Sequence, residues 1–209
     1  MKDQIISVAH DKGGVGKTTI ATNLIVQLLH EHEGETIQVI DLDPKHHLTL
    51  FLKRRADPRV QQLHFKDTKD LRSLLENSRS TLVIDVGGMD TDQTRSAIVY
   101  SDRVITPLAD SQIELDGLMM FKQVIQALQK IRPDLRVSVL LNRIHPKTKK
   151  SVDDLREFIA GQSEVFKIFD TVIRDRAAFK VAYGEAKGVR EINAADKAAT
   201  EIYNLIREL

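Results

Sequence analysis

Short apolar runs alternate along this chain with longer segments of helical period, and this alternation restricts the fold more than any other feature. Runs of strand length, rich in Val, Ile and Leu, lie at residues 5–9, 36–42, 81–86, 103–107, 136–142 and 165–169. Helical periods lie between and after them, at residues 17–31, 48–55, 68–76, 91–100, 115–131, 152–161 and 194–209. The pattern predicts an α/β fold with a doubly wound, mostly parallel sheet and helices on both faces.

The chain is long enough for one such unit, and we expect a single domain over residues 1–209. No Pro-rich or Gly/Ser-rich stretch divides it. Residues 53–67 show the least regular pattern, and we interpret them as a helix end followed by a surface loop.

Composition excludes several classes of site. The sequence contains no cysteine, which rules out disulfides, thiolate zinc sites and iron–sulfur clusters. Its 31 Lys and Arg face 30 Asp and Glu, so any nucleic-acid contact must come from a local basic patch. No apolar run reaches the roughly 18 residues of a membrane span, and residues 1–10 lack a secretory signal, so a cytoplasmic protein is expected.

A glycine-rich loop follows the first predicted strand and precedes the first predicted helix. The usual phosphate-loop pattern, G-x-x-x-x-G-K-[ST], would need Gly at position 11, where Asp11 stands, and the residues fit K-G-G-x-G-K-[ST] instead. Glycines allow backbone N–H groups to approach phosphate oxygens at the positive end of the helix. Lys17 is expected to neutralise the β and γ phosphates and Thr18 to bind Mg²⁺. The predicted loop contacts to nucleotide are Asp11, Lys12, Gly13, Gly14, Val15, Gly16, Lys17, Thr18 and Thr19.

Carboxylates follow two further predicted strands. Asp41 and Asp43 flank Leu42 after the second strand, and alternation places both on one side. One is expected to hold a magnesium-bound water and the other to orient the attacking water. Asp85 ends the apolar run 82–84 and is predicted to lie near Mg²⁺. An Asp at a strand end is often only a turn residue, so these assignments depend on the glycine-rich loop.

Taken together, the segments 12–19, 41–44 and 82–85 resemble the ParA/MinD family of deviant Walker A ATPases, which are P-loop NTPases. Two further segments extend the resemblance. Residues 140–143, with Asn142 and Arg143, are similar to the family's adenine-contacting strand end, and residues 171–176 are similar to its C-terminal segment.

The resemblance implies an ATP- and Mg²⁺-dependent sandwich homodimer. In it, Lys12 crosses to the partner's phosphates, Lys17 acts in cis and Asp43 positions the hydrolytic water. The implied metal ligands are Thr18, Asp41 and Asp85. The pattern departs from the family at Lys45, where Gln is frequent, and at Gly87-Gly88, where Pro-Pro is usual.

Within the family, small ParA proteins of plasmid and cargo partition without an N-terminal helix-turn-helix are most similar. They imply non-specific double-stranded DNA binding, nucleoid association in the ATP state, and a small centromere-binding activator of the ParB or ParG kind. The candidate DNA contacts are basic residues in two segments: Lys147, Lys149, Lys150, Arg174, Arg176, Lys180, Lys187 and Arg190. For any single residue of this set, an equally good interpretation is a solvated surface charge that nearby acidic residues balance.

Three alternatives remain open at this point. A MinD-like membrane ATPase would need a basic amphipathic C-terminal helix, whereas residues 201–209 are amphipathic but not basic and should pack on the sheet. An ATP-dependent enzyme acting on a small carboxylate would need further catalytic groups, which the sequence does not suggest. An adaptor that binds ATP without hydrolysing it would differ only in turnover.

Overall fold

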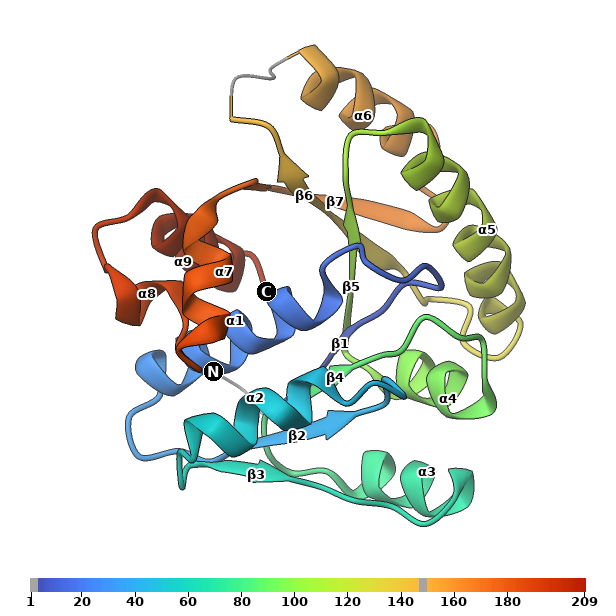
Figure 1. Cartoon of the computed structure of the whole chain (residues 1–209). Coiled ribbons are helices and arrows are strands. Elements are labelled where there is room, and N and C mark those ends of the chain that lie inside the picture. Colours follow the sequence, from blue (N-terminus) through green and yellow to red (C-terminus); the bar gives the residue numbers. More distant parts are fainter. Residues whose placement is uncertain (1–3, 147–149) are drawn as a thin grey trace.

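A seven-stranded sheet forms the centre of the computed structural model, which describes residues 4–146 and 150–209 (Figure 1). The strands are β1 (Ile5–Val8), β2 (Ile37–Asp41), β3 (Val60–Gln62), β4 (Leu82–Asp85), β5 (Arg103–Leu108), β6 (Val137–Ile144) and β7 (Phe166–Arg174). The helices are α1 (Lys17–Glu31), α2 (His47–Arg55), α3 (Thr68–Asn77), α4 (Asp92–Tyr100), α5 (Gln112–Gln129), α6 (Lys150–Ala160), α7 (Ala177–Gly184), α8 (Val189–Ile192) and α9 (Lys197–Arg207).

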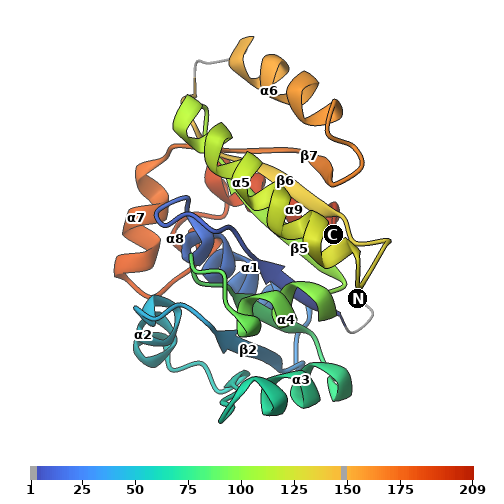
Figure 2. The same ribbon diagram turned by 90° about the vertical axis from the view of Figure 1, so that its right-hand side faces the viewer.

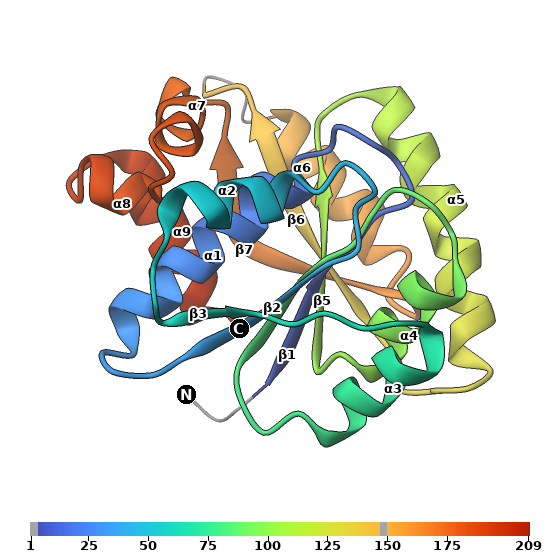
Figure 3. The same cartoon turned by 60° about the horizontal axis from the view of Figure 1, so that its bottom comes forward.

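The strands lie in the order β3-β2-β4-β1-β5-β6-β7, and every pairing in the described part of the chain is parallel. The predicted doubly wound sheet is therefore confirmed. Its right-handed twist turns β2 and β3 across the direction of β5 and β6 (Figure 3). β1 lies between β4 and β5, where the order of strands reverses, and this is where α/β sheets bind ligands.

Side chains alternate between the two faces of the sheet and build a core on each. On β1, Ile5 belongs to the core under α3, α4, α5 and α6, while Ile6 belongs to the core under α1, α2, α7 and α9. Figure 2 looks onto the first of these two helical layers. Because the strands are covered on both faces, they appear in the sequence as continuous apolar runs.

The structure differs from the sequence expectation mainly at the sheet edges. β3 forms within residues 53–67, which were interpreted as a helix end followed by a surface loop. The strand was missed because an edge strand of three residues with two glutamines carries little apolar signal. β7 continues to Arg174, five residues beyond the predicted strand. The helices α7 and α8 lie in a segment for which no helix was predicted.

The C-terminal helix packs on the sheet as predicted. Ile202, Leu205 and Ile206 are buried in the core shared with α1 and β7. After the last turn of α9, Glu208 accepts hydrogen bonds from the backbone N–H groups of Asp170 (2.7 Å) and Thr171 (2.8 Å) on the edge strand β7. Among residues 4–146 and 150–209, no helix has the length and apolar character needed to cross a bilayer.

Candidate nucleotide-binding site

The glycine-rich loop leaves β1 at the centre of the sheet and leads directly into α1. Gly14 (φ 82°) and Gly16 (φ 101°) adopt left-handed backbone conformations that favour glycine. A Cβ at Gly16 would lie 2.4 Å from Nδ2 of Asn142, so position 16 also has no room for a side chain. No side chain caps the first turn of α1, which leaves its N–H groups directed toward the loop for an anion.

The Lys17 side chain is folded back over the loop. Its ammonium donates a hydrogen bond of 2.8 Å to the carbonyl oxygen of Lys12, and only 5% of the residue is exposed. Burial lowers the pKa of Lys17, against the opposing effect of the nearby carboxylates, chiefly Asp85 and Asp43. A positive charge held in a crevice of this kind is suited to binding phosphate oxygens.

Thr18 and Asp85 meet at the end of the loop. The Thr18 hydroxyl donates to Oδ2 of Asp85 at 2.6 Å, and Asp85 is fully buried. Burial raises the pKa of Asp85 to about 7, although the bond from Thr18 acts in the opposite direction. The other oxygen, Oδ1, is buried and has no hydrogen-bond partner in the described part of the chain. A hydroxyl and an unsatisfied carboxylate oxygen at the phosphate loop fit the oxygen ligands of Mg²⁺.

Asp41 lies beside Asp85, because the two are register partners on β2 and β4. Its carboxylate accepts hydrogen bonds from the N–H of Asp43 (3.1 Å) and from the N–H (2.9 Å) and hydroxyl (2.8 Å) of Thr49. These bonds fix the turn that carries Asp43. The carboxylates of Asp41 and Asp43 therefore have different surroundings. Asp43 itself is half-buried and accepts a bond from the N–H of Lys45.

The Gly87-Gly88 pair lies between the two loops. A Cβ at Gly87 would lie 2.9 Å from the carbonyl oxygen of Leu42, and one at Gly88 would lie 3.1 Å from that of Asp11. Larger residues here would push either the phosphate loop or the Asp43 turn outward. Gly87-Gly88 stands where Pro-Pro is usual in the family. At this place the loops that follow β1 and β2 both come close to the residues after β4.

A pocket with a volume of about 230 Å³ lies beside the glycine-rich loop. Its walls hold the predicted nucleotide contacts Asn142 and Arg143, which donate hydrogen bonds to the loop carbonyls of Val15 (2.8 Å) and Gly14 (3.1 Å). The remaining lining residues are Gly14, Gly16, Thr19, Arg174, Asp175, Arg176, Phe179 and Lys180. Three predicted DNA contacts therefore line this pocket beside the predicted nucleotide contacts.

Three of the candidate DNA contacts lie beside acidic side chains. Arg176 binds Glu201 at 2.6 Å, Lys187 binds Glu185 at 2.9 Å, and Arg190 lies 3.9 Å from Glu31. Lys147 and Lys149 lie outside the described residues, as does the side chain of Lys150, whose backbone begins α6.

The second lysine of the loop, Lys12, makes a contact that the sequence did not suggest. Its ammonium lies 2.5 Å from Oε1 of Glu114, in the first turn of α5. Thr49 is likewise a site residue that sequence reasoning missed. The sequence around Glu114 and Thr49 contains no motif that marks either residue. Glu114 resembles an ordinary acidic residue at a helix start, and Thr49 resembles an ordinary helix residue.

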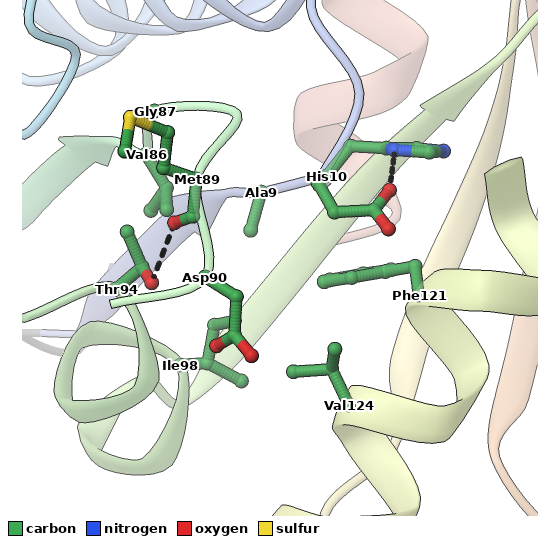
Figure 4. Close-up of a pocket in the computed structure, with 11 residues that line it drawn as sticks. Ala9, His10, Val86, Gly87, Met89, Asp90, Thr94, Ile98, Phe121 and Val124 are labelled. Atoms are coloured by element: carbon green, nitrogen blue, oxygen red, sulfur yellow. Dashed lines mark hydrogen bonds and ion pairs between the residues drawn. The ribbon is translucent and has the colours of Figure 1, made fainter. Parts of the chain in front are cut away.

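A second, narrow pocket is lined by residues from the start of the loop, from the end of β4 and from α4 and α5. Figure 4 shows His10 facing Phe121, with Ala9 and Val86 on the strand side and Val124 farther along α5. The rings of His10 and Phe121 are stacked, with centroids 5.4 Å apart.

The chain is similar to known proteins in family, sequence and fold. The family described as the CobQ/CobB/MinD/ParA nucleotide binding domain matches residues 6–189. The chain is 25% identical, over 98% of its length and 95% of the relative, to the maintenance of carboxysome distribution protein A of Halothiobacillus neapolitanus.

Two solved structures have the same fold. A Cyanothece McdA variant in complex with ATP superimposes with a TM-score of 0.79, at 18% identity over 99% of this chain and 96% of that one. The septum site-determining protein MinD of Pyrococcus horikoshii, complexed with Mg-ADP, gives 0.71, at 18% identity over 99% and 95%.

Proposed function

Since the chain belongs to the CobQ/CobB/MinD/ParA nucleotide-binding family, we propose that it is a Mg²⁺-dependent ATPase whose ATP-bound homodimer segregates or positions a cargo. The observation that carries the proposal is the meeting of Lys17, Thr18 and Asp85 under a glycine-rich loop that also bears a second lysine, Lys12. We propose that residues 1–209 act as one ATPase domain.

In this proposal, each part of the site has one task. The loop N–H groups and Lys17 bind the phosphates, which requires the Lys17 ammonium to leave the Lys12 carbonyl. Thr18 and Asp85 would hold Mg²⁺, whose charge compensates the buried carboxylate and the phosphates. Asp41, the third predicted metal ligand, lies beside Asp85 and supports the turn, and Asp43 would orient the attacking water.

The pocket beside the loop would receive the nucleoside. It adjoins Gly14 and Gly16, and Asn142 and Arg143 form one wall. A base and ribose placed there would lie at the mouth formed by β7 and α7. Arg174, Arg176 and Lys180 line the same mouth, so a bound nucleotide would alter the charge that they present.

DNA and a partner protein complete the proposal. Non-specific binding to duplex DNA would use phosphate contacts from the basic residues of the β6–α6 connection and of the C-terminal segment. The name of the Halothiobacillus relative refers to carboxysome distribution, which makes a protein assembly as reasonable a cargo as a plasmid. An activator bound to the cargo, of the ParB or ParG kind, would stimulate hydrolysis and release.

The test is binding of the Asp43→Ala variant to a random-sequence duplex at several salt concentrations, with ATP and Mg²⁺ or with ADP. We expect tight, salt-sensitive binding with ATP only, because counterion release accompanies phosphate contacts. A Lys17→Ala variant, which should not bind ATP, serves as the control and should bind the duplex only weakly with either nucleotide. Equal binding with ATP and ADP, or none with either, would refute the DNA step.

A further inference from the structure

The side chain of Lys12 is held within its own protomer. Its Nζ donates to Oε1 of Glu114 at 2.5 Å, and the two side chains are 29% and 16% exposed. The Glu114 carboxylate is therefore partly removed from water, and its second oxygen, Oε2, is buried without a hydrogen-bond partner in the described ranges. A carboxylate in this setting depends on the lysine for its neutralisation.

The packing between the loop and α5 holds the two partners together. The backbone N–H of Lys12 donates to Nδ1 of His10 at 3.0 Å, and the His10 ring stacks on Phe121, two turns beyond Glu114 on α5. Gly117 lies where the helix passes the loop, and a Cβ there would lie 3.4 Å from Cε1 of His10 and from Cδ of Lys12. The lysine stem thus lies against the helix, and its ammonium reaches Glu114.

We propose that Glu114 is a positioning residue that competes with nucleotide phosphate for Lys12 and thereby sets how readily ATP produces the dimer. The inference rests on the proposed function, in which Lys12 reaches the partner's phosphates. One ammonium cannot remain in the pair with Glu114 and also cross to another protomer, so dimerisation must break the pair. Loss of the Glu114 charge removes the free-energy cost of breaking this pair.

The experiment compares the parent with Glu114→Gln, which preserves the shape of the side chain and removes its charge. Sedimentation of each with ATP and Mg²⁺ gives the dissociation constant of the dimer. We expect it to be about fivefold lower in Glu114→Gln, because two partly exposed ion pairs, one in each protomer, no longer have to break. ATP affinity at protein concentrations where the chain is monomeric should be the same in both proteins.

Asp116→Asn is the matched control, because it removes an exposed carboxylate from the same helix, where Asp116 accepts a bond from Gln112. It should leave the dimer dissociation constant unchanged. An Asp116→Asn effect as large as that of Glu114→Gln would indicate a general effect of charge and overturn the proposal. A weaker dimer in Glu114→Gln would overturn it too, since it would place Glu114 among the groups that support Lys12 across the interface.

A second readout needs neither ATP nor a dimer. The rate at which an amine-acylating reagent modifies Lys12 in the nucleotide-free protein should rise several-fold in Glu114→Gln and not in Asp116→Asn, because a paired ammonium is less reactive. An unchanged rate would overturn the pairing itself. A raised rate in a protein whose parent never dimerises with ATP would instead refute the proposed function and leave the pairing intact.

Discussion

Single residues at the phosphate loop are constrained by backbone geometry as well as by chemistry. Gly13 and Gly16 are both glycines of the motif, but they differ in the space around them. Gly16 has a positive φ and faces the Asn142 amide at a distance that excludes a Cβ, whereas nothing lies within 4 Å of a Cβ built on Gly13 and its φ is not positive.

These two glycines give a prediction about stability. Gly16→Ala should lower the free energy of unfolding by about 1–3 kcal/mol, because Ala strains the left-handed backbone and collides with Asn142. Gly13→Ala, the matched control, should change it by less than about 0.5 kcal/mol. Urea unfolding of both variants without nucleotide provides the measurement, and equal losses would show that the geometry at position 16 is not the cause.

At the scale of elements, an ion-pair network joins α2, β3 and α8. Arg55, at the end of α2, binds Glu191 of α8 at 2.7 Å and Asp57 at 3.2 Å, and Arg59, before β3, binds Asp57 at 3.0 Å. The hydrogen bond from Arg59 holds the pKa of Asp57 below its usual range, and the charge of Arg55 adds to the effect. The network anchors the edge strand that the sequence pattern did not reveal.

A pH dependence follows from this network. A carboxyl whose pKa is lowered by folding contributes stability that is fully present above its unfolded value, near 4, and is lost as pH falls through the folded value. Asp57→Asn should therefore cost about 1–2 kcal/mol at pH 7 and progressively less below about pH 4. Denaturant unfolding between pH 7 and pH 3 tests this.

The control for Asp57 is Asp134→Asn. Asp134 is 79% exposed in its pair with Arg132, so its loss should be close to neutral at every pH. A cost for Asp57→Asn that stays constant from pH 7 to pH 3 would contradict the ionic origin of the stabilisation.

At the scale of the whole molecule, the proposed cycle divides nucleotide binding, dimerisation and hydrolysis among Lys17, Lys12 and Asp43, respectively. Asp43→Ala should reduce ATP turnover about a hundredfold or more and leave a persistent ATP dimer, because the water loses its orienting carboxylate. Lys12→Ala should still bind ATP and remain monomeric. Turnover assays and sedimentation with ATP and Mg²⁺ check both variants, and turnover at the parent rate in Asp43→Ala would remove Asp43 from this role.

The sequence predicted the centre of the molecule better than its periphery. The strands buried on both faces and the loop after β1 are local patterns, and they were found where expected. β3 was missed because its edge position requires few apolar residues. The pair between Lys12 and Glu114 joins residues 102 positions apart, and only tertiary packing creates it.

The positions of the basic residues depend on the fold. Arg174, Arg176 and Lys180 were assigned to DNA as members of a basic cluster, and the structure places them on the wall of the pocket beside the phosphate loop. A sequence shows the sign and number of such charges, whereas the direction in which these side chains point depends on how β7 and α7 meet.

The edge of the sheet at β7 is covered by acidic side chains from the C-terminal helix α9 and the residue after it. The N–H groups of Asp170, Thr171 and Arg174 donate to carboxylates of Glu208 and Glu201, where a neighbouring strand would otherwise bind. An incoming chain would have to displace charged acceptors before it could extend the ladder there. Edge-to-edge pairing of two copies at β7 is thereby disfavoured. The nucleotide-dependent association proposed above would therefore have to use other surfaces of the molecule.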